Sequence, residues 1–68
     1  MGRPETVPDK LTPAKAVERL HDLRDNWSHD PEVMHAYADL ILMAVLRRTV
    51  AGKAVADAFD ELNPMWYA

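Results

Sequence analysis

The sequence contains no cysteine, and only two glycines and one phenylalanine occur among its 68 residues. The absence of cysteine excludes disulfides and thiolate metal sites. A domain this small buries a modest share of its surface. Its stability must therefore come from regular helix packing, from self-association, or from a metal held by histidine and carboxylate side chains.

Positive charge and long apolar runs are also scarce. Eight basic against eleven acidic residues give a net charge of −3, which disfavours binding to nucleic acid through Arg47 and Arg48. The longest apolar run, 40–46, has seven residues, whereas a membrane-spanning helix needs about 20. The first residues lack the apolar segment of a secretory signal. We expect a cytoplasmic protein that neither spans a membrane nor binds nucleic acid.

Helix start and stop signals divide the chain. Thr12-Pro13 and Asp30-Pro31 each pair a capping side chain with a proline suited to the first helical position. We predict helices over 13–26, 31–49 and 53–62, with Gly52 in the turn between the last two. Residues 1–11 show no periodicity, and we expect a flexible lead-in to a single domain spanning 12–68.

The spacing of apolar residues predicts how these helices pack. The helix over 31–49 is apolar on nearly all sides, which is typical of a helix buried on nearly all sides. Short connections favour antiparallel neighbours. The predicted fold is therefore all-α, a small three-helix bundle with a central, nearly all-apolar second helix. Its expected core comprises Leu20, Leu23, Leu42, Leu46, Phe59 and Leu62.

One polar pair interrupts this apolar helix. His35 and Asp39 are four residues apart, so they share a helix face with Leu42 and Leu46. We interpret them as a structural hydrogen-bonded pair, because buried polar groups need partners. The alternative is a metal or catalytic site, since a histidine nitrogen and a carboxylate one turn apart can bind one ion. No catalytic residue set and no cofactor are predicted.

The C-terminal aromatic residues and part of the central helix suggest a binding surface. Trp and Tyr are common interface anchors, and a tail carrying them is expected to dock, preferably on its own bundle. Two flanking helices cover only part of the central one. The predicted partner-binding residues are Tyr37, Leu40, Ile41, Trp66 and Tyr67.

From Asp30 onward the chain resembles a group of short bacterial and phage proteins. The resemblance lies in Asp30-Pro31-Glu32, in His35-Ala36-Tyr37-Ala38-Asp39 before the apolar run, and in the terminal Trp66-Tyr67-Ala68. It covers some 40 residues and departs from the group at Met65 and over 47–52. It implies no particular activity, since none is established for the group.

These features lead to two functional hypotheses. The first is a non-enzymatic helical interaction module that self-associates or binds a protein partner, motivated by the surplus apolar surface and the aromatic tail. The alternative is a metal-binding hydrolase, or an accessory subunit of one, that uses His35 and Asp39.

Overall fold

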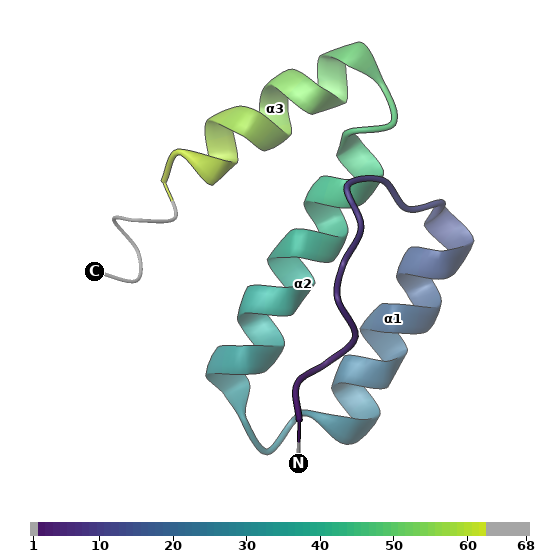
Figure 1. The fold of residues 1–68 in the computed structure, drawn as a ribbon, viewed down its shortest axis with the longest axis vertical. Coiled ribbons are helices and arrows are strands. Elements are labelled where there is room, and N and C mark those ends of the chain that lie inside the picture. Colours follow the sequence, from purple (N-terminus) through teal and green to yellow (C-terminus); the bar gives the residue numbers. More distant parts are fainter. Residues whose placement is uncertain (1, 63–68) are drawn as a thin grey trace.

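The computed structural model describes residues 2–62, which form three α-helices and no strand. They are α1 (Pro13–Asn26), α2 (Pro31–Leu46) and α3 (Val50–Asp60). α2 lies in the middle and packs against both neighbours (Figure 1). This confirms the all-α, three-helix architecture. No helix in the described part of the chain is long and apolar enough to cross a membrane.

Each helix begins at a side-chain cap. The Thr12 hydroxyl accepts a hydrogen bond from the Lys15 amide at 3.2 Å, and the Asp30 carboxylate accepts one from the Val33 amide at 3.2 Å. These bonds satisfy backbone donors that the first helical turn leaves without a partner. The predicted starts of α1 and α2 are confirmed.

The boundary between α2 and α3 differs from the prediction. α2 ends at Leu46 rather than near residue 49, and α3 begins at Val50 rather than at 53. The reason is a third cap, in which the Thr49 hydroxyl accepts a hydrogen bond from the Gly52 amide at 2.9 Å. Gly52 therefore lies in the first turn of α3 and not in a connecting turn.

Gly52 is needed there for close packing. Its φ angle is not positive, so the reason is not a left-handed conformation. A Cβ atom at this position would overlap the carbonyl oxygen of Leu46, the last residue of α2. The glycine thus allows the start of α3 to pass directly over the end of α2.

The main core lies between α1, α2 and the segment that precedes them. Its buried members are Leu11, Ala16, Leu23, Ile41 and Ala44. The Leu11 amide donates a hydrogen bond to the Ala44 carbonyl at 3.1 Å, so the N-terminal segment is fixed to α2. Figure 1 shows this segment running back along the α1–α2 pair. Leu11 is a core residue that the spacing of apolar residues does not predict.

Half of the expected core is on the surface. Leu23 is buried, but Leu42, Leu46 and Leu62 are 54%, 38% and 41% exposed. The sequence predicted that part of α2 stays uncovered, but it assigned that part to Tyr37, Leu40 and Ile41 and not to Leu42 and Leu46. The described residues form a flat layer, 35 × 32 × 15 Å, in which the three helices lie side by side (Figure 1). A single layer leaves a strip of α2 uncovered.

Candidate functional site

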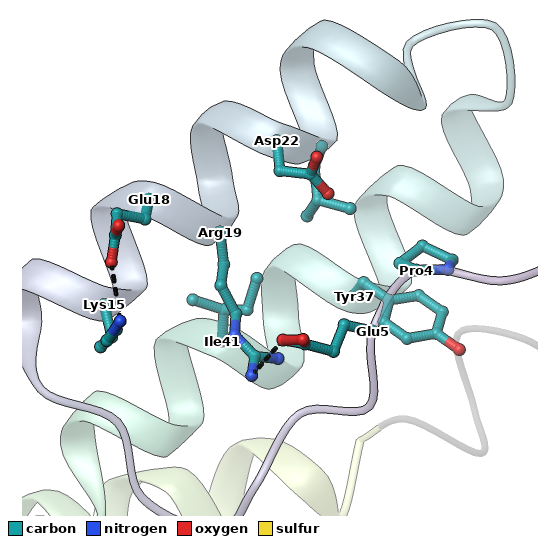
Figure 2. A pocket seen from close by; sticks show the side chains of 9 residues that line it. Pro4, Glu5, Lys15, Glu18, Arg19, Asp22, Tyr37 and Ile41 are labelled. Carbon is teal, nitrogen blue, oxygen red and sulfur yellow. Dashed lines mark ion pairs between the residues drawn. The ribbon is translucent and has the colours of Figure 1, made fainter.

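A hollow lies between α1, α2 and the N-terminal segment (Figure 2). It has a volume of about 420 Å³ and is lined by Pro4, Glu5, Lys15, Glu18, Arg19, Asp22, Leu23, Tyr37 and Ile41. Lys15 pairs with Glu18 at 3.4 Å, and Arg19 pairs with Glu5 at 2.7 Å. Arg19 also donates a hydrogen bond to the Thr6 carbonyl at 2.8 Å. The two Arg19 contacts fasten the N-terminal segment to α1, and the Lys15–Glu18 pair lies within α1, so these charges already have partners within the chain.

The His35–Asp39 pair forms as the spacing predicted. His35 Nδ1 lies 3.4 Å from Asp39 Oδ2, with the His35 side chain 67% exposed and the Asp39 side chain 15% exposed. Asp39 takes part in further contacts besides this one. Across residues 2–62, no three histidine or acidic side chains converge in the way a metal ion requires. The pair therefore lacks a third protein ligand in this part of the chain.

His35 and Asp39 begin a stripe along α2. His35, Asp39, Leu42 and Leu46 follow one another at spacings of four, three and four, so they lie along one face. We call these four residues the outer stripe. Two residues along a helix turn its surface by about 200°, so Leu42 and Leu46 point away from Ala44, which Leu11 covers. The outer stripe is thus on the side opposite the N-terminal segment.

Exposed apolar side chains continue onto α3. Val50, four residues beyond Leu46, is 92% exposed, and Val55 is 58% exposed. Leu62, just after the helix, is 41% exposed. Large apolar side chains scattered singly are normal on a protein surface, whereas contiguous apolar patches mark interaction sites.

The residues predicted to bind a partner differ in how far they are exposed. Leu40 is 39% exposed and Tyr37 is half-buried. Ile41 is only 2% exposed and belongs to the core, which corrects its assignment to a partner surface. Trp66 and Tyr67 lie outside the described residues, so their predicted docking stays a prediction.

Sequence reasoning wrongly placed two leucines of α2 in the core. Leu42 and Leu46 were expected inside, yet they are the exposed residues of the outer stripe. The four-three-four spacing from His35 was the available signal, since it showed that the two leucines share the face of a polar pair. That face could have been recognised as the solvent side.

The two arginines after α2 differ in their surroundings. Arg47 lies 3.7 Å from Asp57 of α3 and is 22% exposed, so it ties the two helices together. Asp57 also accepts a hydrogen bond from Lys53 at 2.8 Å. This bond, together with the charges of Lys53 and Arg47, lowers the pKa of the Asp57 carboxyl. Arg48 is exposed and forms no ion pair with another described residue.

Comparisons with known proteins found no relative of this chain. No family model, no curated protein and no solved structure matches the chain.

Proposed function

We propose that this protein is a non-enzymatic interaction module that binds a protein partner through the outer stripe. The observation that carries the proposal is the exposure of Leu42 and Leu46, two large apolar side chains one helical turn apart. Each would gain stability by leaving water, at about 25 cal/mol for each Å² of apolar surface buried. A monomer that keeps such residues exposed is consistent with a surface reserved for association.

The polar members of the outer stripe fit the same role. An interface needs groups that choose among partners, and hydrogen-bonding side chains beside apolar anchors serve that purpose. His35 is exposed and stands two turns before Leu42 on the same face. The pair could thus orient a partner that the leucines bind. No specific observation favours the metal-dependent alternative at His35 and Asp39.

The proposal is tested by affinity capture from a lysate of the native host, followed by mass spectrometry. The bait is the wild-type chain, the Leu42→Asp variant or the Val17→Asp variant. Val17 is a matched control because it is 50% exposed, close to the 54% of Leu42, but lies on α1. We expect proteins that both the wild type and Val17→Asp retain and that Leu42→Asp loses.

Circular dichroism melting of the three baits shows whether each is folded. If folded Leu42→Asp captures the same proteins as the wild type, the outer stripe is not the binding surface. The same conclusion follows if Val17→Asp loses them equally, because the loss would then reflect added charge in general.

A further inference from the structure

A second surface lies under residues 2–10, which we call the strap. The strap has no helix or strand and runs along the α1–α2 pair (Figure 1). It covers a groove whose floor includes Leu23 of α1 and Tyr37 and Ile41 of α2. We propose that the strap stands in for an extended segment of a partner protein, which displaces it and binds in this groove. The partner segment carries an acidic residue for Arg19 and a large apolar side chain beside it. This goes beyond the proposed function, because it uses a different surface.

The strap is held by few contacts. Pro4 is buried and Val7 is half-buried, whereas the other strap residues are exposed. Among the described residues, no backbone hydrogen bond joins the strap to a helix, and the first such bond is made by Leu11, just after it. The ion pair from Glu5 to Arg19 lies at the surface, with the Glu5 side chain 76% exposed, and surface ion pairs contribute little. The strap can therefore leave while Leu11 stays in the core.

Arg19 shows which chemistry the groove recognises. One of its guanidinium nitrogens lies 2.7 Å from the Glu5 carboxylate, and another donates a hydrogen bond to the Thr6 carbonyl at 2.8 Å. The first contact selects an acidic side chain. The second accepts any residue in the next position, since every residue carries a backbone carbonyl. A segment that presents a carboxylate followed by a carbonyl can therefore make both contacts.

The strap fits its groove incompletely. The hollow of about 420 Å³ lies beside Pro4 and Glu5 (Figure 2), and another of about 390 Å³ lies beside Arg3. Tyr37 lines both hollows. A segment with an apolar side chain larger than that of Pro4 would bury surface here and gain contacts that the strap does not make.

The same hollows argue against a second copy of this chain as the partner. The strap of a second copy would leave the same hollows and make the same contacts, so it would gain nothing over the chain's own strap. The chain's own strap is also tethered, which gives it an effective concentration in about the millimolar range. Only a segment that fits the groove better displaces the strap at lower concentrations. The partner is therefore a different protein.

Peptide titration of the isotopically labelled full chain, followed by NMR, tests the proposal. The probes are three peptides with blocked ends: residues 2–10, the same peptide with Pro4→Phe, and the peptide with both Pro4→Phe and Glu5→Gln. We expect the amide signals of Arg19 and Tyr37 to shift. The Pro4→Phe peptide should bind about threefold to tenfold more tightly than the strap peptide, because it buries more apolar surface. Adding Glu5→Gln should weaken binding about threefold or more, because the contact with Arg19 loses its charge.

Variants of the full chain separate the strap from the groove. Glu5→Arg brings like charges together and should open the strap. It should raise the affinity for the Pro4→Phe peptide about fivefold to tenfold, since apparent affinity follows the fraction of chains with an open groove. Arg19→Gln should remove the preference for the acidic peptide. Arg24→Gln is the matched control, because Arg24 also lies on α1 but pairs with Asp25 and lines neither hollow. It should bind as the wild type does, and circular dichroism checks that each variant keeps its helices.

Three results would overturn the proposal. They are the absence of peptide-induced shifts in folded Glu5→Arg at millimolar peptide, equal binding of the strap and Pro4→Phe peptides, and a preference for the acidic peptide that persists in Arg19→Gln. A wild-type mass above 7.7 kDa that returns to this value in Arg19→Gln would also overturn it, because a second copy would then occupy the groove. The capture experiment with Leu42→Asp concerns the outer stripe, so its outcome is independent of these results.

Discussion

The side of α2 that faces α1 and the outer stripe on its other side both carry large apolar residues, but only the first is covered. Ile41 and Ala44 on the inner side are 2% and 0% exposed, whereas Leu42 on the outer stripe is 54% exposed. The inner side is covered by α1 and by the N-terminal segment through Leu11. On the outer stripe, the side chains of His35 and Leu42 are the most exposed, at 67% and 54%. What separates the two sides is therefore the covering segments and not the apolar content of α2.

The largest expected effect contrasts adjacent residues on the two sides. Ile41→Ala removes buried side-chain atoms and should cost about 2–5 kcal/mol of unfolding free energy. Leu42→Ala, on a half-exposed residue, should cost about 0.5 kcal/mol or less in the monomer. Urea unfolding in dilute solution measures both. Equal losses would mean that Leu42 is buried in the monomer, and the comparison of the two sides would fail.

A second prediction concerns the N-terminal segment that covers the inner side. Leu11 is 7% exposed and its amide is bonded to Ala44. Leu11→Ala should therefore cost about 2–3 kcal/mol, near the lower end of the range for buried leucines. Removing residues 1–10 is a separate test of the Arg19 contacts, and it should destabilise the domain less than Leu11→Ala does. If Leu11→Ala leaves the unfolding midpoint unchanged, the segment is not part of the core.

The N-terminal segment also shows which features of the fold could be predicted from the sequence. Caps are local, so Thr12-Pro13 and Asp30-Pro31 predicted two helix starts correctly. The position of Leu11 depends on a contact with Ala44, 33 residues away in the sequence. No periodicity in the sequence indicates this contact. The same limit explains why Leu42 and Leu46 were wrongly predicted to lie in the core. Helical spacing showed that Leu42 and Leu46 share a face, but which face a neighbour covers is decided by packing.

The His35–Asp39 pair was predictable for the same local reason. Its spacing placed the two side chains together, and the structure confirms the contact. The end of α2 was mispredicted because glycine is a common turn residue, and Gly52 was therefore assigned to a turn. Its actual role, close approach to the Leu46 carbonyl, depends on the path of α3.

The third prediction concerns this approach. Gly52→Ala would normally favour a helix, because alanine has the higher helix propensity. Here its Cβ overlaps the backbone of Leu46, so we expect a loss of about 1–3 kcal/mol, as for other overpacked sites. Ala51→Gly is the control, because it changes propensity at an exposed neighbour without adding an atom. A stabilised Gly52→Ala variant would show that α3 does not pass closely over α2.

The fourth prediction concerns the polar end of the outer stripe. Since His35 is largely exposed, His35→Ala should cost no more than about 1 kcal/mol. Zinc, manganese or magnesium should leave the melting temperature of the wild type unchanged if the pair is structural. A metal-dependent rise that disappears in Asp39→Ala would instead establish a metal site, because a ligand that binds the folded state raises its stability with concentration.

The smallest effect is expected at the junction of α2 and α3, where charges contribute alongside apolar contacts. The hydrogen bond from Lys53, followed by the charges of Lys53 and Arg47, lowers the pKa of Asp57. A carboxyl with a lowered pKa stabilises the fold above its ordinary pKa of about 3.9, and this contribution is lost as the pH falls through the lowered value. The junction should thus keep this contribution from pH 5 upward and lose it only in stronger acid. NMR titration should find the Asp57 pKa below its ordinary value in the wild type and closer to it in Lys53→Gln, whereas an ordinary pKa in the wild type would mean that the Lys53 contact does not persist in solution.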